Sequence, residues 1–145
     1  MTNLELARGL LEQAGTRLKA LDLARAEGNF AYAVRLAQEA VELSLKAMLY
    51  YVGVDPPKWH DVGSILRDNS SNFPGLPRDS IDELAWISSR LRGDRERSMY
   101  GDEAMGVPPG ALYNGYDGRI AGEWAGRVYS VAGDLIAGQG PQSRR

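Results

Sequence analysis

The sequence predicts an all-α fold, an up-and-down antiparallel bundle of four to five helices, and three observations support it. The segment 29–51 carries apolar residues along two adjacent helical stripes, so it must pack between several other helices. The other long apolar patterns also recur at helical spacing, and no stretch alternates with the period of a strand. The chain has 145 residues, enough for one domain with its own core. We therefore expect a single helical domain over residues 1–138 and a flexible C-terminal tail over 139–145.

The first helix is expected to run from Thr2 to about Ala26. Thr2 and Glu5 have the spacing of a capping box, and leucine and alanine residues follow at heptad-like spacing. Gly28 and Asn29 then supply a flexible residue and a new N-cap. A break this short predicts that the first two helices are antiparallel neighbours.

The second helix should end near Gly53, because two consecutive prolines, Pro56 and Pro57, cannot continue it. The segment 61–67 carries apolar residues at helical spacing and predicts a short third helix. The next segment, 68–77, is polar and contains proline and glycine, which indicates a loop.

The last two helices are expected to begin at aspartate caps, Asp79 for the fourth and Asp117 for the last. Between them, residues 101–118 hold five glycines and two adjacent prolines, a composition that favours a surface loop. The residues expected to face inward are Ile81, Leu84, Ser88 and Leu91 in the fourth helix and Ala121, Trp124, Val128, Val131 and Leu135 in the last.

Composition excludes several classes of function. The net charge is -2 and the pI is near 5.4, so any contact with nucleic acid has to come from a local patch. The chain has no cysteine and one histidine, which excludes disulfides, thiolate metal sites and multi-histidine metal sites. We therefore expect no metal and no cofactor. No apolar run approaches membrane-spanning length, so we expect a cytoplasmic location and no membrane partner.

An arginine-rich segment is the first candidate site. Arg90, Arg92, Arg95 and Arg97 lie within eight residues, and Tyr100 follows. Arginines on one face can hold phosphates with several charge-assisted donors. The alternative interpretation is that they pair with nearby carboxylates and complement the dipole at a helix end. The sequence leaves both interpretations open.

The second candidate site is the segment at the mouth of the third helix, where Lys58 and His60 flank Trp59. Histidine can act as a general acid or base because its reference pKa lies near neutrality. The alternative is a histidine that closes a helix end, with Trp59 as a packing anchor. A third candidate is the pair Tyr113 and Tyr116, since tyrosines can stack on bases or lie at a subunit interface.

The order of these segments resembles the HEPN family, the "higher eukaryotes and prokaryotes nucleotide-binding" helical domain. The matching stretches are RLAQEAVELSLKAMLYYVG, WHDVGSIL and RERSMYGDE, and the resemblance covers about Leu4 to Leu135. It implies a helical bundle that often forms homodimers. Many family members are metal-independent ribonucleases, and many are toxins encoded beside a minimal nucleotidyltransferase that serves as antitoxin.

Ribonuclease members of the family carry an R-x(4–6)-H motif, and this chain departs from it. His60 is the only histidine, and no arginine precedes it at that spacing. The segment from Arg95 to Tyr100 gives R-x4-Y instead. Tyrosine is a poor general base near neutral pH, with an ordinary pKa near 10, but it can donate a hydrogen bond to a phosphate oxygen. The resemblance therefore implies Arg95 and Tyr100 as the pair in the catalytic position, and leaves open whether the chain is an enzyme.

Three functions follow as hypotheses. The favoured one is a homodimeric HEPN-like module that binds nucleotide or RNA phosphate through the arginine-rich face, without clear catalytic activity. The second is a divergent metal-independent ribonuclease toxin, in which Arg95 stabilises the scissile phosphate and Tyr100 or His60 assists proton transfer. The third is a helical partner of a minimal nucleotidyltransferase, of the toxin–antitoxin type. Apolar residues beyond one stripe of the first and last helices also favour a dimer: Leu10, Leu23, Ile120 and Ile136.

Overall fold

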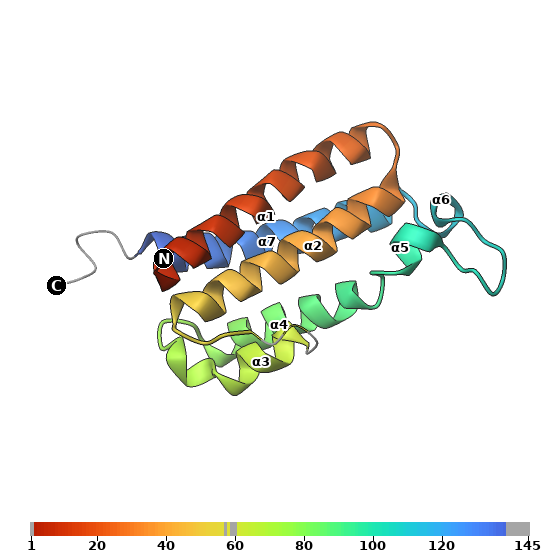
Figure 1. Cartoon of the computed structure of the whole chain (residues 1–145). Coiled ribbons are helices and arrows are strands. Elements are labelled where there is room, and N and C mark those ends of the chain that lie inside the picture. Colours follow the sequence, from red (N-terminus) through yellow and green to blue (C-terminus); the bar gives the residue numbers. More distant parts are fainter. Residues whose placement is uncertain (1, 57, 59–60, 139–145) are drawn as a thin grey trace.

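Four long helices form the body of the molecule (Figure 1), a computed structural model that describes residues 2–56, 58 and 61–138. The long helices α1, α2, α4 and α7 run up and down in turn, and the short α3 packs against α4. The predicted all-α bundle is thus confirmed. The predicted tail, 139–145, lies outside the described residues. The elements are α1 (Asn3–Ala26), α2 (Phe30–Tyr51), α3 (Val62–Asp68), η1 (Ser70–Asn72), α4 (Arg78–Arg92), α5 (Arg97–Tyr100), α6 (Pro109–Leu112) and α7 (Gly115–Ala137).

The helix α2 lies at the centre of the bundle. It packs along α1 and α7 and also contacts α3, α4, α5 and α6. Both apolar stripes predicted for it contribute to the core, with Val34 and Met48 buried from one and Ala33 and Ala40 from the other. Because each large aliphatic side chain that is fully buried contributes about 1.5–3 kcal/mol, the packing of α2 supplies much of the stability of the domain.

The ends of α1 and α2 follow the predicted caps. The N–H of Glu5 donates to the Thr2 hydroxyl at 3.1 Å, and the N–H of Tyr32 donates to the Asn29 side chain at 3.2 Å. Gly28, between the two helices, has φ +77°, a conformation that favours glycine. The first two helices are therefore antiparallel neighbours, as the short break predicts.

The start of α4 differs from the prediction. Pro77 occupies the N-cap position in an extended conformation, and the helix begins at Arg78. Asp79 lies inside the first turn instead of capping it, where its carboxylate still complements the helix dipole. Asp61, at the start of α3, does cap its helix, because its Oδ1 accepts from the N–H of Gly63 at 3.1 Å.

The start of α7 also lies earlier than predicted. Asn114 is the N-cap, and Asp117 is its partner in a reciprocal capping box. Asn114 donates its N–H to Asp117 Oδ2 at 2.8 Å, and Asp117 donates its N–H to Asn114 Oδ1 at 3.1 Å. The prediction was wrong because Asp117 stands three residues inside the motif that fixes the helix start.

The inner face of α7 consists mainly of small residues. Trp124, Val131 and Leu135 were expected on this face but lie at the edge of the core, half-buried. Ile136, expected to be free for a partner, is 2% exposed and belongs to a core cluster. The residues that α7 buries are Gly118, Ala121, Ala125, Val128, Ala132 and Ile136.

Between α4 and α7 the chain forms a small projection at one end of the bundle, residues 93–114, which we call the lobe (Figure 1). It contains α5, an antiparallel bridge between Asp102 and Val107, and α6. Gly101 has φ +79°, and a Cβ there would overlap the carbonyl oxygen of Val107. The composition predicts a surface loop without helix or strand over 101–118, whereas the structure has a bridge and the short helix α6 within it.

None of the helices in the described ranges is both long and apolar enough to cross a lipid bilayer.

Gly63 marks the closest approach of α3 to α4. A Cβ at this position would lie 2.9 Å from the backbone oxygen and 3.0 Å from the Cα of Ala85. Gly63→Ala should therefore lower the free energy of unfolding by about 1–3 kcal/mol, since backbone atoms cannot move aside cheaply. The measurement is urea unfolding followed by circular dichroism.

Gly9→Ala is the matched control, because Gly9 is an exposed helical glycine with nothing within 4 Å of its Cβ position. It should raise the free energy of unfolding by up to about 1 kcal/mol through helix propensity. Similar small effects of both substitutions would contradict the close approach of α3 and α4.

Candidate functional site

The four arginines of the candidate site do not share one helical face. The helix α4 ends at Arg92, and the chain turns at Gly93. Arg90 therefore lies in the last turn of α4, Arg95 lies in the turn that follows, and Arg97 begins α5. The break separates side chains that a continuous helix would have aligned.

Two of the arginines face α2 and the start of α3. Arg92 Nη1 lies 3.9 Å from Asp61 Oδ1, and Arg95 Nη1 lies 3.7 Å from Glu42 Oε1. The side chains of Arg92 and Arg95 are 47% and 54% exposed. Arg35, on α2, donates to the backbone oxygen of Arg95 at 3.4 Å. These contacts fix the turn after α4 against a charged stripe of α2, which consists of Arg35, Glu39, Glu42 and Lys46.

The charged stripe of α2 shares its carboxylates between neighbouring cations. Glu39 accepts from Arg35 at 2.7 Å and from Arg17, on α1, at 3.2 Å. Glu42 lies 3.7 Å from Lys46 and also contacts the turn after α4. Each of these glutamates therefore serves two cations and can neutralise only one.

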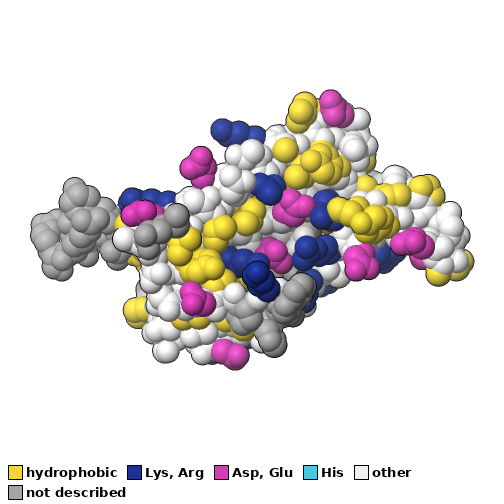
Figure 2. Space-filling view, in the orientation of Figure 1, with side chains coloured by type: hydrophobic (Ala, Val, Ile, Leu, Met, Phe, Trp, Pro, Cys, Tyr) yellow, Lys and Arg dark blue, Asp and Glu magenta, His cyan; other side chains and the backbone are white. Residues whose placement is uncertain are grey.

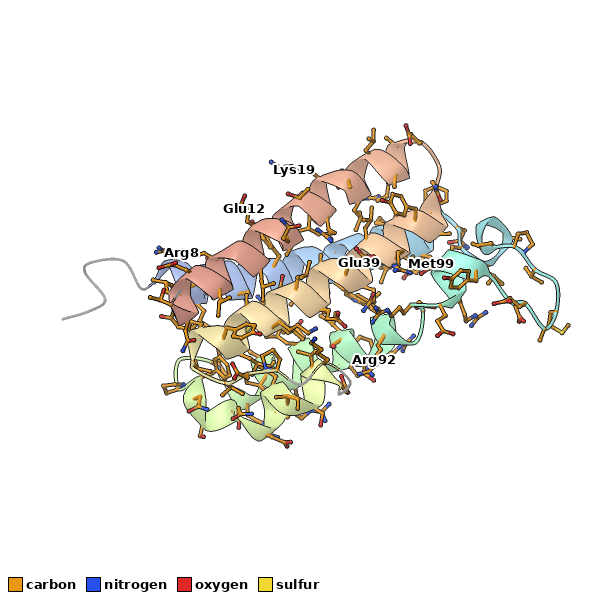
Figure 3. The ribbon with its side chains drawn as sticks, in the orientation of Figure 1. Arg8, Glu12, Lys19, Glu39, Arg92 and Met99 are labelled. Atoms are coloured by element: carbon orange, nitrogen blue, oxygen red, sulfur yellow. The ribbon has the colours of Figure 1, made fainter. Side chains whose placement is uncertain are left out.

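These residues form a continuous patch, which we call the cationic surface. Figure 2 shows basic and acidic side chains alternating across the middle of this face, and Figure 3 labels Glu39 and Arg92 on it. Five cations stand against three carboxylates, so the surface carries excess positive charge although the whole chain is acidic. Its members are Arg17, Arg35, Lys46, Arg92 and Arg95, with Glu39, Glu42 and Asp61 between them.

The ion pairs of the cationic surface are open to exchange with a ligand. All are partly exposed, and pairs of this kind each contribute about 0–1 kcal/mol to stability. A phosphate that replaces the carboxylate partner of Arg92 or Arg95 therefore costs the protein little stability. Arginine can also bind phosphate with two parallel hydrogen bonds.

Arg90 lies apart from this surface, in a groove between α4 and α7. Its guanidinium carbon lies 5.1 Å from the ring centroid of Trp86. Trp86 in turn meets Trp124 edge to face, with centroids 5.1 Å apart and planes at 76°. The structure thus assigns Arg90 to an aromatic environment, while Arg97 is exposed at the start of α5.

Tyr113 connects the lobe to the end of α4. Its hydroxyl donates to Asp94 Oδ1 at 2.8 Å. Burial, together with this hydrogen bond and the negative charge of Asp94, raises the pKa of Tyr113 well above its ordinary value, and the positive charge of Arg97 lowers it in part. Tyr113 therefore stays protonated and acts as a tether. Sequence analysis missed this role because the partners lie 19 residues apart.

Comparison with protein-family models matches the HEPN domain over residues 7–132. The chain belongs to the HEPN family. The resemblance inferred from its three sequence stretches is thus confirmed. A search of curated proteins found no match.

Among solved structures, this HEPN domain is similar to TT1696 from Thermus thermophilus, known from its crystal structure. The two share 23% sequence identity with a TM-score of 0.69, and the match covers 88% of this chain and 96% of that one. At this level of identity the likeness shows a common fold.

In this HEPN domain the R-x4-Y segment spans the turn after α4 and the helix α5. Arg95 points to Glu42, whereas Tyr100 is 60% exposed and lies in a hollow that also contains Glu96, Arg97, Asp102 and Glu103. The described residues around Tyr100 are therefore mostly acidic, unlike those around Arg95.

Asp61, which follows the second candidate segment in the sequence, contacts Arg92. Lys58 is exposed in the connection between α2 and α3. His60 and Trp59 lie outside the described residues, so their assignment to a site stays a prediction. Arg35 and Lys46 were not predicted as site residues, because i,i+4 pairs such as theirs with Glu39 and Glu42 are also typical of a solvated helix face.

The Tyr113 tether can be tested by its pH dependence. Tyr113→Phe removes the donor to Asp94 and should cost roughly 1 kcal/mol at neutral pH. The raised pKa means that folded protein holds the Tyr113 proton more tightly than unfolded chain, whose tyrosine has the ordinary value of 10.0. This stabilisation is complete below that pH and is lost as the pH rises above it.

Urea unfolding from about pH 8 to about pH 11 should therefore show a steeper loss of stability in the wild type than in Tyr113→Phe. Tyr116→Phe, at a ring that is 64% exposed, is the matched control and should follow the wild type. Parallel curves for the wild type and Tyr113→Phe would contradict the tether.

Proposed function

We propose that this HEPN domain binds nucleotide or RNA phosphate at the cationic surface and does not cleave it. One observation carries the proposal: Glu39 and Glu42 each serve two cations, which leaves the surface with uncompensated positive charge. Membership of the HEPN family supports a nucleotide- or RNA-related role.

The physical basis is local electrostatics. A phosphate group at this surface adds the missing negative charge and releases counterions from the nucleic acid. Arg92 and Arg95 are each about half exposed, so their guanidinium groups can turn toward a ligand without leaving a buried charge behind. The two other arginines of the sequence prediction, Arg90 and Arg97, stay predictions as phosphate ligands.

The environment of Tyr100 supports binding without cleavage. Cleavage through the pair Arg95 and Tyr100 requires the scissile phosphate to reach both side chains. The hollow around Tyr100 contains Glu96, Asp102 and Glu103 beside a single arginine, Arg97, so its carboxylates outnumber its cations and disfavour a phosphate. A divergent ribonuclease is therefore the alternative that the experiment below has to exclude.

We also infer that the domain acts as a homodimer through apolar side chains where the lobe meets the start of α2. Tyr32 is 49% and Met99 42% exposed, and both line a shallow groove with Pro109. Figure 2 shows hydrophobic side chains gathered there, around the position labelled Met99 in Figure 3. A minimal nucleotidyltransferase, the other partner that the family resemblance implies, stays a prediction.

The binding proposal predicts that Arg95→Ala weakens the affinity for RNA and lowers its salt dependence. Each lost contact to a single-strand phosphate should reduce the slope of log K against log salt by about 0.7. The measurement is a gel shift with end-labelled structured RNA over a series of salt concentrations, in EDTA. Arg127→Ala is the matched control, because Arg127 forms a similar exposed ion pair with Glu83 at 3.1 Å on another part of the molecule.

The same gels test for cleavage, and intact RNA is the expected result. Products that form with the wild type but not with Arg95→Ala would make the protein a metal-independent ribonuclease. Equal loss of affinity in Arg95→Ala and Arg127→Ala would show that only the overall charge matters. The absence of both a gel shift and cleavage would overturn the proposal and favour a protein partner.

The dimer proposal predicts a change of mass in solution. Replacing both Tyr32 and Met99 by glutamate places charges in the shared apolar patch and should shift the protein to monomer, as measured by light scattering coupled to size exclusion. Met105→Glu, at a side chain that is 76% exposed and outside this groove, should leave the mass unchanged. A wild type that is already monomeric would refute the inference.

A further inference from the structure

We propose that the groove between α4 and α7 is a separate binding site, a slot for a nucleobase that carries an exocyclic amino group. It goes beyond the proposed function, which concerns phosphate groups on another surface. The groove has a volume of about 300 Å³, at the lower end of the range for small-molecule sites, which suits one planar ring system. Its lining includes Trp86, Arg90, Asp94, Tyr116, Asp117 and Trp124.

Aromatic side chains form the walls of the groove. Trp86 and Trp124 stand at 76° to each other, so a planar ring stacked on one indole meets the other at its edge. Trp86 is 48% exposed, a large apolar surface that remains in water unless something covers it. Nucleobases stack on such rings regardless of their identity, because every base has a π face.

A guanidinium group with unneutralised charge lies at the rim. Arg90 is stacked over Trp86 at 5.1 Å, and among the described residues no carboxylate lies within ion-pair distance of it. Its N–H groups therefore remain available to the carbonyl oxygen of a base or to the phosphate of a nucleotide. Arg119 lies over the Tyr116 ring at 5.0 Å and repeats the arrangement, although it pairs with Glu123.

Two carboxylates in the groove supply the acceptors. Asp94 uses Oδ1 to accept from Tyr113, and Asp117 uses Oδ2 to accept from the N–H of Asn114. In the part of the chain that the structure describes, the second oxygen of each has no hydrogen-bond donor. These oxygens can accept from an exocyclic amino group, as carboxylates do from the N4 amino group of cytosine.

This combination selects a base over other ligands with a flat or cationic surface. The edge of an aminated base offers donors to the carboxylates and acceptors to Arg90, whereas a phenyl ring offers neither. A quaternary ammonium ion would suit the aromatic walls and the carboxylates, but it offers no acceptor to Arg90 and no N–H donor to Asp94 or Asp117. Since Tyr113 fixes the orientation of Asp94, the slot exists before any ligand arrives.

The decisive comparison is CMP against UMP, measured by isothermal titration calorimetry. The two have the same size and charge and differ along one edge of the ring, where cytosine has an amino group beside an unprotonated nitrogen and uracil has an oxygen beside an N–H. We expect CMP to bind and UMP to bind about tenfold more weakly, because the uracil oxygen cannot donate to a carboxylate and is left facing it unpaired. Trp86→Ala should weaken CMP binding about tenfold or more by removing the stacking surface.

Controls separate binding from folding. Trp86→Phe keeps a ring and should retain part of the affinity, while Met105→Ala removes an exposed apolar side chain outside the groove and should retain all of it. No heat with CMP, equal binding of CMP and UMP, or unchanged binding in Trp86→Ala would each overturn the slot. Comparing CMP with oligo(C) shows whether a free nucleotide or RNA supplies the base, and tighter binding of either one supports the slot.

The outcomes are independent of those for the proposed function. CMP binding that depends on Trp86, in a protein that shifts no RNA, would refute the phosphate-binding proposal alone. An RNA shift that depends on Arg95, in a protein that binds no CMP, would refute the slot alone.

Discussion

The burial of α2 on most of its sides is the constraint on which the rest of the molecule depends. A helix packed against α1, α7, α4 and α3 has only one narrow stripe on which charged side chains can remain hydrated. Arg35, Glu39, Glu42 and Lys46 occupy that stripe. The same packing that forms the core therefore concentrates charge in one line, and the turn after α4 adds Arg95 to it. Core and candidate site have one physical cause.

The sequence predicted the elements whose signals are local. The caps at Thr2 and Asn29 and the wide apolar pattern of α2 each depend on residues within a few turns, and all are found in the structure. The inner face of α7 was predicted in part. Ala121 and Val128 are buried as expected, but hydrophobicity favoured Trp124, Val131 and Leu135 over their buried neighbours Ala125, Ala132 and Ile136. Close approach to α2 requires small side chains, and Ala125 and Ala132 are fully buried there. That requirement belongs to the pair of helices and is not visible in either one alone.

The candidate site was predictable in composition but not in arrangement. Family resemblance and charge pattern both indicated the arginine-rich segment. The four arginines are separated because α4 stops at Arg92. Their surroundings then depend on contacts between distant parts of the chain, such as Arg95 with Glu42 and Tyr113 with Asp94. Pairing of this kind has no periodic signature. The aromatic groove was hidden for the same reason, since Trp86 and Trp124 come from helices that are far apart in sequence.

The lobe has a thermodynamic consequence. In the described chain, the buried apolar residues stop at Leu91 and resume at Ala121. The lobe between them is held by backbone hydrogen bonds, by the Tyr113 tether and by the contacts of Arg95 with Arg35 and Glu42, while the bundle has a continuous core. We expect such a segment to unfold and refold as a separate cooperative unit while the four long helices stay intact. The amides of the lobe should exchange with solvent far sooner than those of α2. The stability of a ligand contact near Arg95 therefore depends on the free energy of unfolding of the lobe, not on that of the whole domain.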